Sequence, residues 1–123
     1  MVNQGKLLTG FPKLYSKLHF FECGDGWFQL IWDLSEKLSK FGMIARQVKE
    51  KFGGLRFYFD FDAPGYEGYD EARKLVEEAE NLSYSVCEAT GKPGKLRNDI
   101  GWLKTLCEEE YEKSLADDED QNP

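Results

Sequence analysis

Two cysteines in the last third of the chain have the spacing of a zinc ribbon. Cys87 begins the pattern C-x2-T-G and Cys107 begins the pattern C-x2-E, with sixteen residues between Thr90 and Cys107. A zinc ribbon with four ligands has two C-x2-C pairs that are separated by roughly fifteen to twenty residues. The chain therefore has the frame of a zinc ribbon, with Thr90 and Glu110 at two of the four ligand positions.

Three of these four positions carry a group that zinc accepts, because zinc binds thiolate, imidazole and carboxylate ligands. Cys87 and Cys107 supply two thiolates. Glu110 stands three residues after Cys107 on the same helical face, so its carboxylate can replace a cysteine. Thr90 is a poor ligand, since a neutral hydroxyl does not compensate the charge of the ion.

The remaining ligand must be water or a side chain from another part of the chain. Residues 19–27, which read HFFECGDGW, offer His19, Cys23 and Asp25. Asp25 stands directly before a helical pattern, where a carboxylate ordinarily caps the helix. A lone histidine is more often a partly buried side chain than a ligand. The predicted ligands of a structural zinc ion are Cys87, Cys107, Glu110 and Cys23.

Two alternatives to zinc remain open for the cysteine pair. In the first, packing alone holds the frame, and Cys87 and Cys107 are small buried hydrophobic residues. In the second, they form a disulfide, which a reducing cytosol disfavours. A catalytic metal would need an open coordination position and a general base in a cleft. With one histidine and no phosphate-binding loop, the chain is expected not to be an enzyme.

Hydrophobic periodicity predicts the elements that position this pair. Apolar residues at three- and four-residue steps predict helices over 27–41 and 69–85. Between them, alternation of apolar and polar residues predicts a β-hairpin over 43–61, with Gly53-Gly54 as its two-residue loop. In the first strand, Ile44, Val48 and Phe52 are separated by even steps and are expected to point to the same face of the sheet.

The patterns at the two ends of the chain are less regular. Residues 1–18 are expected to be extended, with a short turn. After a metal-binding type of turn at 87–91, we expect a short strand at 95–97. A last helix is expected over 103–115, because its apolar residues recur on one side.

These elements predict one α+β domain over residues 1–116. An antiparallel hairpin or small sheet is packed by two to three helices, and a degenerate zinc-ribbon-like element occupies 87–110. The acidic tail over 117–123 has no large apolar residue and is expected to be disordered.

Charge favours a protein partner over a nucleic acid. The net charge is −7, and residues 117–120 contribute four of the negative charges. Direct binding to nucleic acid needs clustered Lys and Arg and is not expected, whereas opposite potentials attract a basic protein. The basic residues of the predicted hairpin are Arg46, Lys49, Lys51 and Arg56, interleaved with Tyr58. This cluster is ordinarily a solvated sheet face, and a nucleic-acid face is the alternative.

Aromatic side chains supply a candidate docking surface, since aromatic residues dominate the binding energy of protein interfaces. The expected aromatic rim also includes Trp32, and the residues predicted to bind a partner are Trp27, Tyr58, Tyr66, Tyr69 and Trp102. No apolar run approaches the roughly 18 residues of a membrane helix, so no membrane contact is expected. No charged-then-apolar leader opens the sequence, and the expected compartment is the cytoplasm.

Four stretches resemble a family of small proteins from bacteriophages and prophages. They are FECGDGW at 21–27, VKEKFGGLRFY at 48–58, CEATG at 87–91 and GWLKTLC at 101–107. Members of that family carry the full ribbon, C-x2-C-G followed by C-x2-C/H, which implies bound zinc. This chain differs at the positions of Thr90 and Glu110. The resemblance implies a viral origin and a host-cell cytoplasmic location, but no reaction.

Small size, acidity and this resemblance together favour an inhibitor. We expect a phage-encoded, non-catalytic protein that binds a basic, nucleic-acid-handling host defence nuclease in a stoichiometric complex, as anti-CRISPR proteins do. The channel of an RNA-guided nuclease is strongly positive because it holds a heteroduplex. The alternatives are a zinc-ribbon regulator that binds nucleic acid, and a phage accessory or assembly protein.

Overall fold

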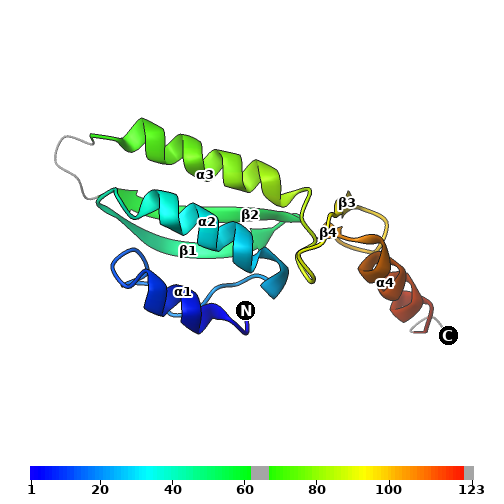
Figure 1. Cartoon of the computed structure of the whole chain (residues 1–123). Helices are drawn as coiled ribbons and strands as arrows, with labels where there is room; N and C mark the ends of the chain where they lie inside the picture. Colours follow the sequence, from blue (N-terminus) through cyan, green and yellow to red (C-terminus); the bar gives the residue numbers. More distant parts are fainter. Residues whose placement is uncertain (62–66, 121–123) are drawn as a thin grey trace.

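The computed structural model describes residues 1–61 and 67–120, and it confirms the α+β class (Figure 1). The elements in chain order are α1 (Gln4–Gly10), the 3₁₀ turn η1 (Asp25–Trp27), α2 (Phe28–Leu38), β1 (Met43–Lys51), β2 (Gly54–Phe61), α3 (Tyr69–Ser83), β3 (Lys95–Arg97), β4 (Lys104–Leu106) and α4 (Glu108–Asp120). β1 and β2 form one antiparallel sheet, and β3 and β4 form a second. None of the helices in the described part is long and apolar enough to cross a membrane.

The hairpin turn lies one residue earlier than the sequence predicted. Phe52 and Gly53 form the loop, with φ values of 54° and 84°, and Gly54 already pairs with Lys51 in the sheet. Two successive residues with positive φ are typical of a type I′ turn, which matches the twist of the flanking strands. Gly54 is needed for another reason, because the ring of Tyr84 occupies the place of its missing Cβ.

A β-bulge in β1 changes which residues face the core. The register shifts between Ala45 and Gln47, so the intervening Arg46 is opposite no β2 residue in the backbone pairing. Met43, Ala45 and Val48 are all buried as a result. The predicted shared parity of Ile44, Val48 and Phe52 is wrong, since a bulge inserts one residue and reverses the alternation beyond it.

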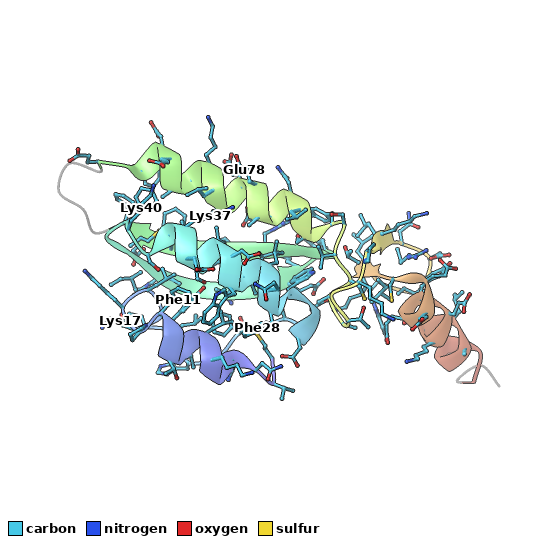
Figure 2. All side chains as sticks on the ribbon, viewed as in Figure 1. Phe11, Lys17, Phe28, Lys37, Lys40 and Glu78 are labelled. Carbon is cyan, nitrogen blue, oxygen red and sulfur yellow. The ribbon has the colours of Figure 1, made fainter. Side chains whose placement is uncertain are left out.

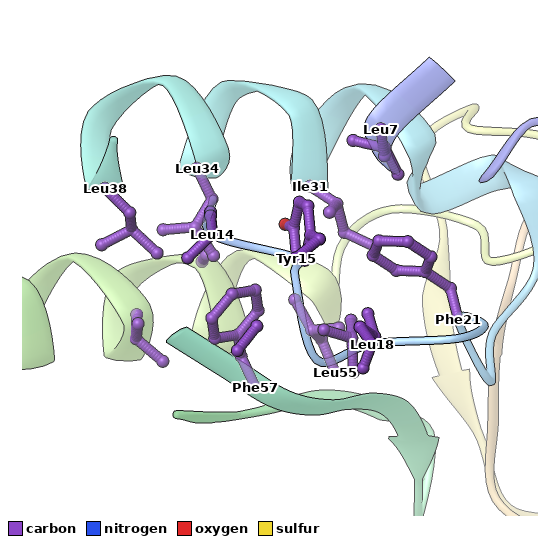
Figure 3. Close-up of a cluster of buried hydrophobic side chains, with 14 of the residues drawn as sticks. Leu7, Leu14, Tyr15, Leu18, Phe21, Ile31, Leu34, Leu38, Leu55 and Phe57 are labelled. Atoms are coloured by element: carbon purple, nitrogen blue, oxygen red, sulfur yellow. The ribbon is translucent and has the colours of Figure 1, made fainter. Parts of the chain in front are cut away.

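The main core lies between the hairpin and the helices (Figure 3). Ile31, Leu34 and Leu38 of α2 face Leu55 and Phe57 of β2 across this layer. The segment before α2 adds the buried side chains Leu14, Tyr15, Leu18 and Phe21. α3 packs against both β2 and α2 and completes the layer.

The N-terminal segment is partly helical, and the prediction of an extended segment is wrong there. α1 has no side-chain cap, and of its residues only Leu7 is buried. Such a short helix is marginal in water and is held by tertiary packing, which its own sequence does not reveal.

The C-terminal region differs from the predicted long helix. Residues 104–106 form strand β4, which pairs with β3, and helix α4 begins only at Glu108. Leu103, Leu106 and Cys107 have the apolar spacing of a helix. In the structure, Leu106 and Cys107 are instead buried in a second, smaller core. α4 continues to Asp120, past the predicted helix end. The disorder expected of the acidic tail stays a prediction. Residues 121–123 of the predicted tail lie outside the described part.

Candidate functional site

Cys87 and Cys107 lie side by side, as the ribbon spacing predicted. They form the second, smaller core together with Ile100 and Leu106. The backbone N–H of Cys107 donates to the sulfur of Cys87, which also receives the N–H groups of Ala89 and Thr90. Both cysteines are free thiols in this structure.

Thr90 occupies a predicted ligand position and links the two sulfur atoms. Its hydroxyl lies 3.7 Å from Sγ of Cys107 and also hydrogen-bonds to Cys87. Burial raises the pKa of Cys87, but the hydrogen bonds from the Thr90 hydroxyl and from the backbone N–H of Cys107 outweigh burial and lower this pKa overall. The turn is closed by Gly91, which has a φ of 82°. At the predicted metal site, the Thr90 hydroxyl therefore contacts both thiols.

The other predicted ligands do not join this pair. Glu110 points along α4, with its carboxylate 3.3 Å from Nζ of Lys113. Cys23 belongs to the main core, where burial first and then the charge of Glu88 raise its pKa to about 12. The predicted four-ligand set is therefore not assembled in this structure.

The two remaining candidate ligands have other places. His19 is exposed on the surface of the molecule. The carboxylate of Asp25 accepts the backbone N–H groups of Val2 and Asn3, at 3.1 and 3.0 Å, and so holds the start of the chain. In residues 1–61 and 67–116, no three His, Cys, Asp or Glu side chains gather to hold a metal ion. Two thiols and a neutral hydroxyl do not fit a four-ligand zinc site, and zinc binding stays a prediction.

The ECGDGW segment docks the C-terminal region onto the main domain, a role that sequence reasoning missed. The N–H of Gly24 donates to a carboxylate oxygen of Glu88 at 2.9 Å, and the N–H of Gly26 donates to the carbonyl oxygen of Glu88 at 2.7 Å. A Cβ on either glycine would meet the main chain of residues 87–88. The two glycines flanking an aspartate were the available signal for this close approach.

Further bonds across the same junction come from buried polar groups. The indole N–H of Trp27 donates to the carbonyl oxygen of Val86 at 2.8 Å, and the hydroxyl of Thr105 donates to that of Gly53 at 2.6 Å. The ammonium of Lys104 lies 3.1 Å from Glu88 and 3.6 Å from a second carboxylate, that of Glu50. Burial lowers the pKa of Lys104, but these carboxylates outweigh burial and raise it.

Of the aromatic residues predicted to bind a partner, two are freely exposed. Tyr58 is 45% exposed and Trp102 is 65% exposed. Trp27 is wholly buried, so its predicted place in a docking surface is wrong. Tyr69 is half-buried and its ring packs against those of Phe59 and Phe61. The remaining residue of the predicted set, at position 66, lies outside the described residues.

Trp32, the sixth aromatic residue considered, lines an open hollow of about 600 Å³ between α1 and α2. Its ring packs against those of Phe11 and Phe28, with centroids 4.8 and 5.9 Å away. Figure 2 shows Phe11 and Phe28 in the space between these two helices. The polar side chains in its lining are those of Lys6, Thr9 and Gln29.

Charge is divided unequally between the elements. Helix α4 contains eight Asp and Glu residues and one Lys, for a formal charge of −7. This equals the net charge of the whole chain, so the other residues together are formally neutral. The sequence contained this signal, but an average over the chain concealed it.

Comparison of the chain with protein-family models, curated proteins and solved structures found no match. The resemblance to phage proteins therefore stays a prediction.

Proposed function

We propose that this protein is a phage-encoded, non-catalytic inhibitor that binds an RNA-guided host defence nuclease in the cytoplasm of the host cell. The supporting observation is the concentration of the whole net charge in α4, a helix that lies at one end of the molecule (Figure 1). A nuclease of this kind has a basic channel, which holds a heteroduplex through its backbone charge. α4 is the element that we propose enters or covers that channel.

One side of α4 is occupied and the other side is available to a partner. Tyr111 and Leu115 pack onto the small core, while Glu108, Glu109 and Glu112 are exposed. A helix of 13 residues is about 20 Å long at 1.5 Å per residue. The helix thus has a formal charge of −7 over a length comparable to several nucleotides of a nucleic-acid backbone.

The first turn of α4 is anchored by its own ion pairs. Arg97 Nη2 lies 3.2 Å from a carboxylate oxygen of Glu108, and Lys92 Nζ lies 3.5 Å from one of Glu109. Acidic residues at a helix N-terminus are also favoured by the helix dipole. The carboxylate of Glu112 is exposed one turn further along. We expect Glu112 to contribute more to binding than the two paired glutamates.

An exposed aromatic residue lies before the strand that leads to α4. Trp102 is 65% exposed, and an exposed Trp beside a charged surface is the type of residue that anchors protein complexes. We propose Trp102 as the apolar contact of the interface, with α4 supplying the charge that attracts the partner.

Titration calorimetry with purified, guide-loaded nucleases tests this proposal. We expect Glu112→Lys to weaken binding about 10-fold or more, and to slow association most at low salt. Glu78→Lys, on the exposed face of α3, makes the same charge change far from α4 and serves as the matched control. Equal effects of the two variants, or no binding to any nuclease of the panel, would remove the support for this function.

A further inference from the structure

The outer face of the hairpin is not covered by any described element. Residues of β1 and β2 that point away from the core alternate with buried ones, and they are joined on the β1 edge by Phe20 and Glu22. We call this surface the open face. It consists of Phe20, Glu22, Arg46, Gln47, Lys49, Lys51, Arg56, Tyr58 and Asp60.

We propose that the open face binds single-stranded nucleic acid. The proposal does not depend on the inhibitor function, because it concerns a different surface of opposite charge. The net acidity of the sequence argued against such binding, but that acidity resides in α4, and the rest of the chain is formally neutral. The charge of the open face itself therefore decides what it attracts.

Like charges meet across the two strands of this face. Lys49 pairs directly with Arg56 in the β1–β2 register, and like charges in such a pair are destabilising. Glu22 is the neighbour of Lys49 on its other side, and the guanidinium of Arg56 donates to the hydroxyl of Tyr84 at 3.2 Å. Lys51 extends the row toward the turn. Among the ion pairs of the described residues, none includes Lys49 or Lys51. A phosphate group placed between these cations would relieve their repulsion.

The acidic residues of the open face are already engaged. Asp60 lies 3.1 Å from Arg46, and Glu22 accepts a hydrogen bond from the amide of Gln47 at 2.8 Å. Among the ion pairs of the described residues, neither carboxylate is paired with Lys49, Lys51 or Arg56. The face is therefore polarised, with a balanced end near the bulge and a basic end near the turn.

Two aromatic rings lie at the balanced end, where a base can stack. Phe20 is 57% exposed and Tyr58 is 45% exposed. Both rings line a hollow of about 360 Å³, which also has Lys17 and His19 in its wall. Figure 2 shows Lys17 beside β1 at this edge. Aromatic rings bind unstacked bases, whereas the bases of a duplex are stacked and paired. This favours a single strand over a duplex.

The arrangement gives each part of a nucleotide strand its own contact. Bases stack on Phe20 and Tyr58, and the backbone follows the row of Lys49, Arg56 and Lys51. DNA and RNA share this chemistry. A 2′-hydroxyl-specific contact would be shown by a preference for RNA.

Fluorescence anisotropy with labelled oligothymidylate and oligouridylate tests the open face. We expect binding at about 50 mM salt, with a slope of log K against log salt near −2 for roughly three phosphate contacts. Tyr58→Ala should weaken binding about 5- to 150-fold, which corresponds to the loss of one stacked base, and Tyr58→Phe should restore it. Lys49→Ala should reduce the slope by about 0.7.

Lys74→Ala is the matched control, since this lysine is exposed on α3 and its loss should leave binding unchanged. Circular dichroism and thermal melting of each variant would confirm that the fold is intact. Glu112→Lys, which tests the inhibitor function, should not weaken oligonucleotide binding, so the two proposals fail separately.

Several outcomes would overturn the proposal. One is the absence of binding at about 20 mM salt, where phosphate contacts are strongest. Another is equal binding of duplex, heparin and oligothymidylate without dependence on Tyr58, which would indicate a general polyanion surface. If polyglutamate displaced the oligonucleotide as effectively as unlabelled oligothymidylate does, the ligand of the open face would be an acidic protein segment. Self-association through α4 of a second copy, seen by sedimentation and abolished by Lys49→Ala, would indicate a protein interface.

Discussion

The two sheets of this protein are stabilised in different ways. The hairpin with α1, α2 and α3 encloses a core of large apolar side chains, including Trp27, Phe21 and Ile31. Around β3, β4 and α4, four buried hydrophobic residues form the core within the described part of the chain, and two of them are the small cysteines Cys87 and Cys107. So small a core stabilises little by itself. The C-terminal unit must therefore rely on its junction with the hairpin domain.

That junction consists of polar contacts that few residues could replace. Glu88 accepts from Gly24 and Gly26, and the ammonium of Lys104 lies 3.6 Å from the carboxylate of Glu50 in β1. Within the unit, the guanidinium of Arg97 lies 4.2 Å from the ring centroid of Tyr111 and pairs with a glutamate of α4. The comparison shows how a region with a weak core can hold a fixed position through backbone hydrogen bonds to a stronger one.

The largest effect is expected from Trp27, which belongs to both regions. Trp27→Ala should lower the free energy of unfolding by about 3–5 kcal/mol, because it empties a core site and leaves the carbonyl of Val86 unpaired. Urea denaturation would measure the loss. Trp27→Phe keeps much of the side-chain volume but lacks the indole N–H, so it measures the hydrogen bond to Val86 separately. A loss below about 1 kcal/mol for Trp27→Ala would contradict the placement of this side chain.

Gly26→Ala tests the junction itself. The added Cβ would collide with the main chain of residues 87–88, so we expect a loss of roughly 1–3 kcal/mol in the free energy of unfolding. Gly5→Ala is the matched control, because no atom lies near its Cβ position in α1, and the change should stabilise by about 0.5–1 kcal/mol. Thermal melting would show a lower melting temperature for Gly26→Ala and a higher one for Gly5→Ala. Equal effects would mean that the close approach at Gly26 does not exist.

Alkaline pH should weaken the hairpin domain through Cys23. Its pKa is raised to about 12 in the folded state, so its stabilising contribution is complete below the unfolded value of 9.0 and is lost as pH rises between these values. The loss should approach about 1.4 kcal/mol per pH unit within that window. Unfolding of the wild type and of Cys23→Ala from pH 8 to 11 would reveal it as a difference in slope. Parallel curves would contradict burial of the neutral thiol.

The smallest effect is expected from a chelator. Because the Thr90 hydroxyl already links the sulfur atoms of Cys87 and Cys107, the C-terminal unit should keep its melting temperature when EDTA is added. Elemental analysis of protein purified without chelator provides the direct measurement, with Cys87→Ser and Cys107→Ser as controls. Near-stoichiometric zinc that both variants lose would contradict this expectation and confirm the metal predicted from the ribbon spacing.

The sequence predicted those features that depend on local periodicity or on a known spacing. The hairpin, α2 and α3 followed from apolar patterns, and the ribbon frame correctly placed Cys87 beside Cys107. β4 was missed because the apolar spacing of Leu103, Leu106 and Cys107 also suits a helix. The contact between Gly24 and Glu88 joins residues 64 positions apart, and no local pattern encodes it.

The candidate sites were harder to predict, since they depend on how surfaces combine. The bulge at Arg46 decides which side chains reach the open face, and the alternation in the sequence gave no sign of it. Burial of Trp27 could not be told from exposure, because an aromatic residue at a helix start suits either. The location of the acidity in α4 was readable, but it required counting charges by element.

Cleavage of a target DNA by purified, guide-loaded nucleases, measured while this protein is added in increasing amounts, tests the proposed inhibition most directly. We expect cleavage by the sensitive nuclease to fall in proportion to the protein added and to stop near equimolar amounts. Glu112→Lys should shift that end point to a large excess, and Glu78→Lys should leave it unchanged. Undiminished cleavage by every nuclease of the panel in the presence of a large excess of the protein would contradict the proposed function.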